Sequence, residues 1–342
     1  MGHKRTRLRD IAEKTGFSAN TVSLALRDSP RIPEATRNVI KAVAHELHYM
    51  PNRIAQSLVS QRSMMIGLVL TNLRNPILTQ VAEEVSRVLA EQGYATMFAT
   101  SSRDVAKEQA VIATLRERQC DGILIFPTDH GDVGHLHRLR EIGYPLVSFV
   151  PDPDRRIDCA SSNDELGAAK ATAHLLASGR RKIALLDAAT PLGNTEKRDG
   201  YRKSLEAAGL SMTDDLLVNV PDIRVTDGFN AMEILEARGI RPDAVVATND
   251  SLAVGVELWC QRHRIKVPDA VAVVGFDDIE FARLAAVPVS TIAYPVEIIV
   301  RAAVTRLLEL IAVSGTLPAP TQTMFEPELL VRASTSTSES HD

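Results

Sequence analysis

The sequence is poor in cysteine and aromatic residues, and it contains no long apolar run. Its three cysteines, Cys120, Cys159 and Cys260, are widely spaced. An odd, scattered set argues against a disulfide framework or a zinc site and fits a reducing cytoplasm. No apolar run approaches the ~20 residues that span a bilayer, and the basic N-terminus lacks the apolar stretch of a signal peptide. We therefore expect a cytoplasmic protein without a membrane segment.

The sequence also lacks the common motifs of catalysis. Phosphate-cradling Gly-x-x-x-x-Gly-Lys-Ser/Thr, Gly-x-Ser-x-Gly, Cys-x-x-Cys and His-Glu-x-x-His do not occur. His135 and His137 stand in a loop-like segment, residues 131–137, where we expect surface side chains rather than metal ligands. The adjacent acidic pairs 214–215 and 277–278 suit loop or cap roles better than paired acid/base catalysis across a substrate. We expect no enzymatic activity, no metal and no cofactor.

Charge is distributed unevenly along the chain. Residues 1–62 carry 11 Lys and Arg against 5 Asp and Glu, whereas the remaining 280 residues carry 28 against 38. A basic head on an acidic body suggests an anionic partner for the head alone. A solvated charged surface would have the same composition, so charge by itself does not decide between the two.

The basic head has the periodicity of three short helices. Residues 6–26 divide into two helices, because Gly16 suits a tight turn and Ser18 can cap the second helix. Pro33 opens a third helix. Its buried face is expected to consist of Val39, Ile40, Val43 and Leu47. Three short helices with a tight turn after the first predict a helix-turn-helix unit.

From Met64 onward, apolar strands alternate with amphipathic helices. Strand-like segments such as 122–126 and 270–276 are separated by helical segments such as 77–92 and 251–262. This alternation predicts parallel sheets with helices on both faces, and about ten such units exceed one open sheet. We therefore expect two stacked α/β subdomains behind the all-α head.

A basic helix-turn-helix is a candidate DNA reader, whose second helix enters the major groove with its N-terminal residues nearest the bases. Asn20 can form a bidentate bond to adenine, although an Asn on a solvated helix is otherwise unremarkable. Ala19 and Leu24 can contact thymine methyl groups. Flanking Arg27 and Arg31 suit phosphate contacts. The expected DNA contacts of the head are Thr6, Arg7, Ser18, Ala19, Asn20, Thr21, Leu24 and Arg27.

Two stretches resemble the head and hinge of the lactose/galactose-repressor (LacI/GalR) family: Leu8-Arg-Asp-Ile-Ala-Glu-Lys-Thr-Gly-Phe-Ser-Ala-Asn-Thr-Val-Ser and Tyr49-Met-Pro-Asn-Arg-Ile-Ala-Gln-Ser-Leu. The resemblance implies a homodimer on near-palindromic double-stranded operator DNA. It also implies that residues 52–58 become helical on DNA, with Leu58 wedged into the minor groove. The family often has a long polar or basic side chain where Leu24 stands. The hinge contacts implied are Asn52, Arg53, Ala55 and Leu58.

The resemblance continues through the body of the chain. It is carried by Ile66-Gly-Leu-Val, Asn75-Pro, Asp121-Gly-Ile-Leu, Val246-Ala-Thr-Asn-Asp and Val274-Gly-Phe-Asp-Asp. Members of this family resemble periplasmic sugar-binding proteins, in which two lobes close on a ligand at the carboxyl ends of parallel strands. The implied fold is an all-α helix-turn-helix head followed by an α/β two-lobed, periplasmic-binding-protein-like domain with parallel sheets.

The expected domains follow from this pattern. Residues 1–50 form the DNA-binding head, and residues 51–63 the hinge helix and linker. Residues 64–335 form the two-lobed domain for effector binding and dimerisation. Residues 336–342 form a disordered tail, because the end of the chain is mostly Ser, Thr, Glu and Asp.

Strand ends locate the expected effector site. Asn249 and Asp277 each follow a strand, and amide and carboxylate groups can hold the hydroxyls of a ligand. Asn75 is equally a good turn residue, and Asp250 a good helix cap. The expected effector contacts are Asn75, Ser102, Thr128, Phe149, Lys197, Arg198, Ile223, Asn249 and Asp277.

Two departures from the family pattern bear on the effector. The family usually has Arg in an Arg-x-x-Gly-aromatic motif where this chain has Lys197, with Arg198 beside it; either could anchor the ligand, or neither. Some members stack the effector on an aromatic ring where this chain has Ile223. With few aromatic residues, a flat sugar or purine is less well supported. Four cations would suit an anionic ligand such as a sugar acid or phosphate: Arg74, Arg103, Lys197 and Arg224.

These features predict a repressor that binds operator DNA under the control of a small molecule, either a sugar or a sugar acid. A solute-binding protein is one alternative, which the helix-turn-helix and the missing export signal oppose. A sugar-metabolising α/β enzyme is the other, which the absence of catalytic motifs opposes.

Overall fold

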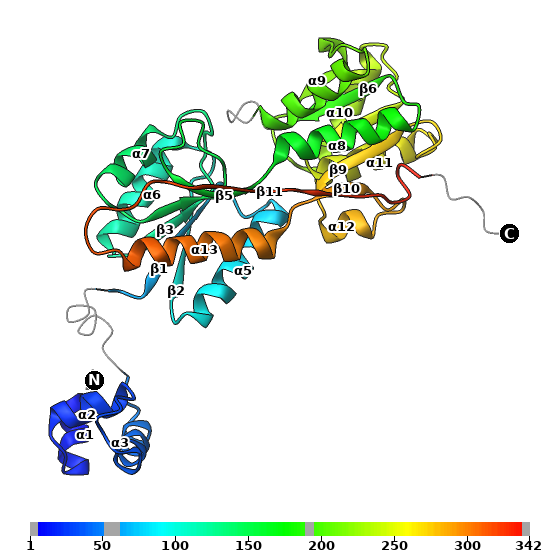
Figure 1. Ribbon diagram of the computed structural model, residues 1–342. Helices are drawn as coiled ribbons and strands as arrows, with labels where there is room; N and C mark the ends of the chain where they lie inside the picture. The colour runs from blue at the N-terminus through cyan, green and yellow to red at the C-terminus, as the bar shows by residue number, and fades with distance from the viewer. Residues whose placement is uncertain (1–5, 51–61, 189–194, 337–342) are drawn as a thin grey trace. The chain divides into compact units, whose positions relative to one another are not determined.

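The computed structural model describes residues 6–50, 62–188 and 195–336, and its chain divides into two compact units, residues 1–63 and 64–342 (Figure 1). The expected hinge helix, residues 52–58, lies outside the described residues. None of the helices within the described ranges is long and apolar enough to cross a membrane.

The head consists of α1 (Leu8–Thr15), α2 (Ala19–Leu26) and α3 (Glu34–Glu46). Gly16 ends α1 in the left-handed conformation with φ 75°, and Ser18 Oγ accepts the Thr21 N–H at the start of α2. Val39, expected in the core, is 52% exposed. It lies about 100° around the helix from Ile40, which is buried. The buried core of the head is Ile11, Val22, Ala25, Ile40 and Ala44.

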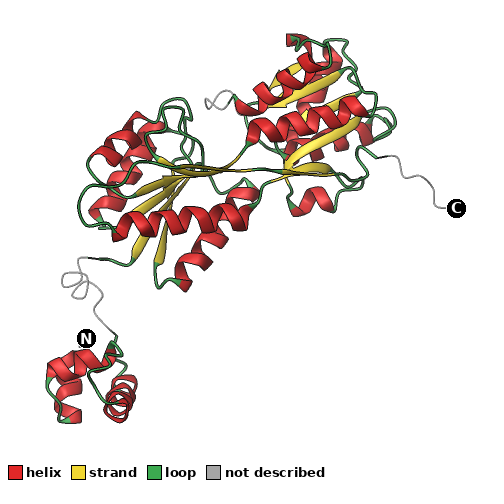
Figure 2. Ribbon diagram, in the orientation of Figure 1, coloured by secondary structure: helices red, strands yellow, loops and turns green. Residues whose placement is uncertain are grey.

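The first lobe of the larger unit is a parallel sheet between two helical layers (Figure 2). Its strand order is β11-β5-β4-β3-β1-β2. The strands are β1 (Met65–Leu70), β2 (Ala95–Thr100), β3 (Gly122–Ile125), β4 (Leu146–Ser148), β5 (Asp158–Ser162) and β11 (Gln322–Phe325). Two core clusters show the layers, because α5 (Pro76–Glu91) and α13 (Val296–Ala312) share one with the sheet, whereas α6 (Val105–Glu117) and α7 (Gly134–Glu141) share the other.

The second lobe has the same three-layer arrangement. Its sheet has the order β12-β10-β9-β8-β6-β7. The strands are β6 (Ile183–Asp187), β7 (Leu217–Asn219), β8 (Ala244–Ala247), β9 (Ala272–Asp277), β10 (Ser290–Ala293) and β12 (Glu328–Leu330). The helices are α8 (Asp164–Ala177), α9 (Glu196–Ala207), α10 (Val225–Ala237), α11 (Asp250–Arg262) and α12 (Glu280–Arg283), and η2 (Asp214–Leu216) is a short 3-10 turn. Helices α8 and α9 cover one face, and α10 and α11 the other.

The chain passes between the two lobes three times, after β5, after β10 and after β11 (Figure 1). β12 enters the second lobe from the first, whereas β10 leaves the second lobe toward the first. This opposite direction explains why β12 pairs antiparallel with β10 while the other strand pairs are parallel.

The segment expected to expose His135 and His137 is instead part of the core of the first lobe. Both residues lie on α7 and are only 9% and 6% exposed. Leu136 and Leu139 are three residues apart, so they lie on the same helix face and pack in the core of the lobe. His135 and His137, on either side of Leu136, are buried with them. The prediction of surface histidines was therefore wrong, because the helix is short and its apolar pattern spans barely two turns.

The C-terminal segment is ordered further than its composition predicts. Ser334 is fully buried, and its hydroxyl donates to the Val273 carbonyl. Ser336, placed in the expected tail, donates its N–H to the Arg332 carbonyl. Residues 337–342 of the tail lie outside the described residues.

Candidate functional site

The N-terminal turn of α2 presents the side chains that the sequence assigns to base contact. Ser18, Ala19 and Asn20 are exposed, and Thr21 and Leu24 are partly exposed. Burial of Val22 and Ala25 against α1 and α3 holds the helix in this orientation. The Ser18 and Thr21 hydroxyls lie 2.9 Å apart, so they are oriented together at the start of the helix.

The predicted DNA contacts that flank α2 differ in whether the protein itself already binds their side chains. The Thr6 hydroxyl donates to the Leu47 carbonyl at 2.9 Å, which fastens the start of the head to the end of α3. Arg7 and Arg27 are exposed. The Arg7 N–H donates to Asp10 at 2.7 Å, which fixes the start of α1 through the backbone. Four predicted hinge contacts lie outside the described residues: Asn52, Arg53, Ala55 and Leu58.

A cavity of about 170 Å³ lies between the two lobes of the larger unit, at the carboxyl ends of strands from both sheets. Of the nine expected effector contacts, six line it: Asn75, Phe149, Lys197, Ile223, Asn249 and Asp277. Asn75 also caps α5, since its side chain accepts the Ile77 N–H at 3.3 Å. Strand-end position is therefore a sound guide to this cavity.

The other three expected contacts do not line the cavity. Ser102 is exposed and accepts from Lys107 at 2.6 Å. Thr128 is buried, and its hydroxyl bonds that of Ser101 at 2.6 Å. Arg198 turns toward the sheet edge, where it bonds Asp187 and Asn219. The Thr128–Ser101 bond links the segments that follow β3 and β2, and Arg198 links the ends of β6 and β7.

Between the two adjacent cations, Lys197 is the one that faces the cavity. Gly200 allows α9 to approach α8 closely, because a Cβ at that position would lie 2.0 Å from the Glu165 carbonyl oxygen. Lys197 Nζ donates to the Thr248 carbonyl at 3.0 Å and lies 3.5 Å from Asp164. It also sits 4.2 Å from the centre of the Phe276 ring. The ammonium is therefore held in place by protein groups.

Asn249 and Asp277 form a hydrogen-bonded pair at the cavity wall. Asn249 Nδ2 donates to Asp277 at 2.5 Å, while Asn249 Oδ1 accepts the Ser251 N–H at the start of α11. Asp277 has φ 102° and Asp278 has φ 57°, which side-chain-bearing residues adopt at a cost, often at functional sites. Burial raises the pKa of Asp277 to about 6, although Lys197 and Asn249 act to lower it.

Asp250, next to Asn249 in the sequence, binds the neighbouring segments through its buried carboxylate. Its carboxylate accepts the Thr291 hydroxyl at 2.6 Å and the Ile279 N–H at 2.9 Å. Asn249, rather than Asp250, supplies the helix cap of α11. Burial raises the pKa of Asp250, and the nearby Asp277 adds to that shift.

Three titratable residues at the cavity were missed from the sequence. Burial raises the pKa of Glu196 to about 7, and the neighbouring Asp164 adds to the effect. Burial lowers the pKa of His130 to about 4. Asp164 follows β5, a strand that the sequence analysis did not predict, so no strand-end signal pointed to it.

Aromatic side chains supply an apolar wall despite their scarcity. Phe126 and Phe149 both line the cavity, and their rings stack with centroids 4.7 Å apart. Phe126 ends a predicted strand, so strand-end reasoning could have found it. Tyr294 lies on the crossing after β10, and its hydroxyl is buried without a hydrogen-bond partner among the described residues.

The cations that suggested an anionic ligand are largely engaged by carboxylates. Arg103 and Arg224 both pair with Asp222, each at 3.0 Å. Three carboxylates line the cavity, namely those of Asp164, Glu196 and Asp277. The cavity therefore has more carboxylates, which can accept hydrogen bonds from a ligand, than cations that are not already paired with a carboxylate.

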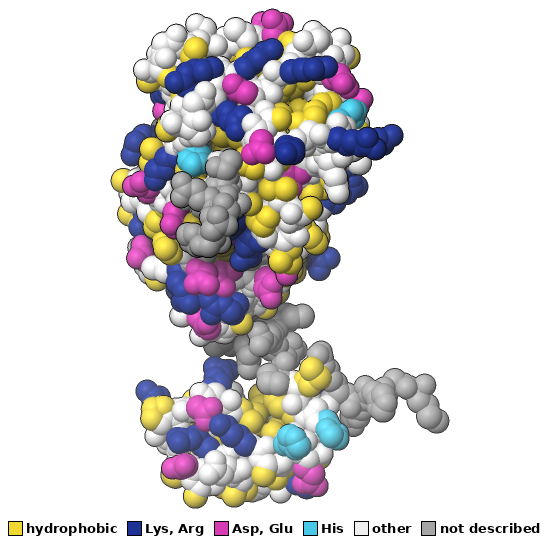
Figure 3. Space-filling view, turned by 90° about the vertical axis from the view of Figure 1, so that its right-hand side faces the viewer, with side chains coloured by type: hydrophobic (Ala, Val, Ile, Leu, Met, Phe, Trp, Pro, Cys, Tyr) yellow, Lys and Arg dark blue, Asp and Glu magenta, His cyan; other side chains and the backbone are white. Residues whose placement is uncertain are grey.

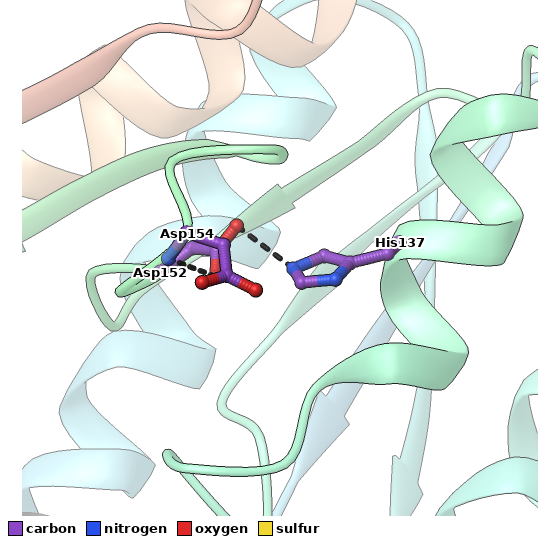
Figure 4. Close-up of side chains that lie close together, drawn as sticks. All are labelled: His137, Asp152 and Asp154. Carbon is purple, nitrogen blue, oxygen red and sulfur yellow. Dashed lines mark hydrogen bonds and ion pairs between the residues drawn. The ribbon is translucent and has the colours of Figure 1, made fainter.

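A separate cluster of His137, Asp152 and Asp154 has groups of the kind that bind metals (Figure 4). His137 Nε2 bonds Asp152 at 2.9 Å, and the Arg156 guanidinium donates to His137 Nδ1 at 3.3 Å. Asp152 also accepts the backbone N–H groups of Asp154, Arg156 and Ile157. Both ring nitrogens and the carboxylate are thus used to fix the loop before β5.

Comparison with known proteins relates both units to one kind of regulator. A family model described as "Bacterial regulatory proteins, lacI family" matches residues 7–52, and a periplasmic-binding-protein-like domain matches residues 172–335. The ribose operon repressor of Escherichia coli (strain K12) is 30% identical over 293 residues, which cover 84% of this chain and 88% of that repressor.

Two solved structures extend the similarity to most of the chain. The Lac repressor dimer bound to operator and the anti-inducer ONPF is 25% identical, with a TM-score of 0.87, and the match covers 98% of this chain and 100% of that one. The complex of the transcriptional regulator CelR with cellobiose is 28% identical, with a TM-score of 0.71, and covers 96% and 100% of the two chains.

Proposed function

This chain belongs to the LacI family of bacterial regulatory proteins, and from that premise we propose how its two units divide the work of a repressor. It is a DNA-binding transcriptional repressor controlled by a sugar-like effector, and it is not an enzyme. The observation that carries the division is the exposed N-terminal turn of α2 in one unit and the strand-end cavity in the other.

The head binds double-stranded operator DNA with α2 in the major groove. Exposed Asn20 reads a base edge, with Ala19 and Leu24 on thymine methyl groups. Exposed Arg7 and Arg27 neutralise phosphates, which positions the head without reading sequence. Two heads of a homodimer suit a near-palindromic operator, with Leu58 of each hinge wedged into the minor groove.

The cavity between the lobes takes a small polyhydroxylated effector. Asn249 and Asp277 offer an amide and a carboxylate to ligand hydroxyls, and the stacked Phe126 and Phe149 offer an apolar face. An uncharged sugar is favoured over a sugar acid, because an acidic group would have to displace Asp164 from Lys197 or Asp222 from Arg103.

A dimer is supported by exposed apolar side chains in both lobes. Phe98 on the edge strand β2 is 47% exposed, and Phe281 on α12 is 69% exposed. Large exposed apolar side chains are frequent at interfaces between subunits. Because the partner of the head is chromosomal DNA, we place the protein in the cytoplasm.

A gel-shift assay with the purified full-length chain and fragments of its source genome tests the function. A subset of fragments should bind tightly, with affinity that falls steeply as salt rises, because phosphate neutralisation releases counterions. Neutral sugars should then alter the binding of those fragments. Uniform weak binding to all fragments, with no effect of salt, would contradict the proposal.

A further inference from the structure

Three side chains that can bind a metal ion lie together on the second lobe, and none of them lines the cavity between the lobes. Glu233 and Glu236 are three residues apart and so share one face of α10. His263 directly follows α11, the helix that packs beside α10 on the same face of the sheet. Its Nε2 atom lies 3.8 Å from a carboxylate oxygen of Glu233 and 3.9 Å from one of Glu236. No metal site was expected from the sequence, because two separate helices contribute these groups.

The hydrogen bond at the other ring nitrogen of His263 decides what Nε2 can bind. Nδ1 lies 2.9 Å from the Trp259 carbonyl oxygen, which can only accept, so Nδ1 carries the hydrogen and donates it. In the neutral imidazole, Nε2 is then an acceptor. Nε2 and the two carboxylate oxygens therefore face one another as three acceptors, with no hydrogen to share between them. In contrast, both ring nitrogens of His137 in the first-lobe cluster are bonded to protein groups.

Trp259 holds two of the three side chains in position. Its indole Nε1 donates to Glu233 at 2.6 Å, and the indole and the His263 ring stack with their centroids 4.2 Å apart. Trp259 itself is only 5% exposed and packs in the core of the lobe, so it fixes both partners. Side chains that bind metals commonly have a second hydrogen-bond partner of this kind, which orients them toward the ion. Glu233 and His263 are therefore oriented before any ion arrives.

The two carboxylates also lack the cations that pair with many other acidic side chains of this protein. Lys and Arg side chains stand among Asp and Glu side chains over the surface shown in Figure 3. Within the described ranges, however, neither Glu233 nor Glu236 forms an ion pair with a Lys or an Arg, and His263 is the basic side chain near both. With a neutral ring, the cluster carries two negative charges, which one divalent cation would neutralise.

We propose that Glu233, Glu236 and His263 bind one divalent transition-metal ion, for which Zn²⁺ is the best match. Zinc accepts both imidazole nitrogen and carboxylate oxygen, whereas Mg²⁺ and Ca²⁺ take oxygen ligands. Ligands about 2.0–2.2 Å from a tetrahedral zinc ion lie roughly 3.4 Å apart, so the two distances from Nε2 need to shorten by only about 0.5 Å. Water completes the coordination, since all three residues are exposed. The ion joins α10 to α11 and stabilises the second lobe, whatever the head binds.

Trp259 provides the readout, because it is the only tryptophan of the chain and contacts two of the proposed ligands. Zinc chloride is titrated into the full-length chain after treatment with a chelator, at about pH 7.5, where an ordinary imidazole is neutral. The fluorescence should change to saturation with a dissociation constant in the micromolar range or below, and EDTA should reverse the change. Equilibrium dialysis should find one zinc ion per chain. Millimolar Mg²⁺ should have no effect.

Two conservative variants, Glu236→Gln and His263→Gln, test the ligands one at a time. Each should raise the dissociation constant at least about tenfold, since even the outer partners of metal ligands contribute about 10–100-fold to affinity. His45→Gln removes an exposed histidine of the head and should leave the titration unchanged. Circular dichroism of the metal-free proteins checks folding, and if one variant does not fold, the other still decides.

Two results would overturn the inference. A titration without saturation up to millimolar zinc would mean that a proton on Nε2 of His263, rather than a metal ion, joins the ring to the carboxylates. Zinc binding that both variants retain at full affinity would mean that the ion lies elsewhere on the chain, such as at His137 and Asp152.

Discussion

Arg103 of the first lobe and Asp222 of the second lobe form an ion pair at 3.0 Å across the two-lobed domain. The Arg103 guanidinium also donates to the Pro221 carbonyl at 3.4 Å, and Arg224 holds the other oxygen of Asp222. Arg103 and Asp222 are 22% and 26% exposed, so the pair is only partly screened by water. The ion pair therefore links the two lobes beside the cavity, which Arg103 helps to line.

The first prediction is that Arg103→Ala shifts the ligand-free protein toward a more open arrangement of the lobes. The substitution removes both contacts to the second lobe, which favours separation of the lobes. Small-angle X-ray scattering should show a larger radius of gyration than for wild type. Arg74→Ala, an exposed arginine of the same lobe, is the control. Identical scattering from the wild-type and Arg103→Ala proteins would exclude a linking role.

The second prediction concerns base reading by Asn20. Asn20→Ala should weaken binding to the preferred operator by about 1–3 kcal/mol and relax the preference at one base pair of each half-site. Selection of binding sites from random DNA, followed by titration, measures both effects. Asn38→Ala removes an exposed Asn from α3 and should change neither. If Asn20→Ala keeps the full base preference, Asn20 does not read a base.

The third prediction concerns the effector response. Asp277→Asn should weaken effector binding about 10- to 100-fold, since a hydrogen bond to a charged group is worth roughly 1.5–3 kcal/mol. Operator binding without effector should persist because the head forms a separate unit. Calorimetric titration and gel shift measure the two properties, with the exposed Asp215→Asn as control. A normal effector response in Asp277→Asn would remove this residue from the site.

The fourth prediction concerns the dependence of stability on pH. Burial raises the pKa of Asp277 from 3.8 to about 6, so between these values the folded chain binds a proton that the unfolded chain has released. The contribution of Asp277 to stability is therefore lost as pH rises through about 6. The shift corresponds to about 3 kcal/mol, so Asp277→Asn should raise the Tm at pH 8 by roughly 5–10 °C and change it little at pH 4. Thermal denaturation without effector at both pH values measures this difference. A variant whose Tm is lower than wild type at pH 8 would contradict the assigned shift.

Local sequence was sufficient to predict helix α2 and part of the lining of the cavity between the lobes. The apolar residues of 19–26 have helical spacing, and Gly16 and Ser18 stand just before them. A turn glycine and a helix-capping serine act on the backbone of adjacent residues, so both signals can be recognised in a short stretch of sequence. Asn249 and Asp277 follow apolar strands directly, so the shared edge of a parallel sheet brings them together.

The partners of each charged side chain were decided by tertiary structure. Lys197 and Arg198 are adjacent in sequence, yet the packing of α9 on α8 directs Lys197 to the cavity and Arg198 to Asp187. Arg103 meets Asp222 across 119 positions of sequence, a separation that no local pattern reports.

The sequence by itself therefore determined most of the helices and strands, although not α7 or β5, and where the chain could present a polar strand end. The folded structure alone decided which of those polar groups are committed to one another and which face the cavity. The physical reason is that periodicity depends on neighbours along the chain, whereas burial and ion pairing depend on groups that only folding brings within a few ångströms.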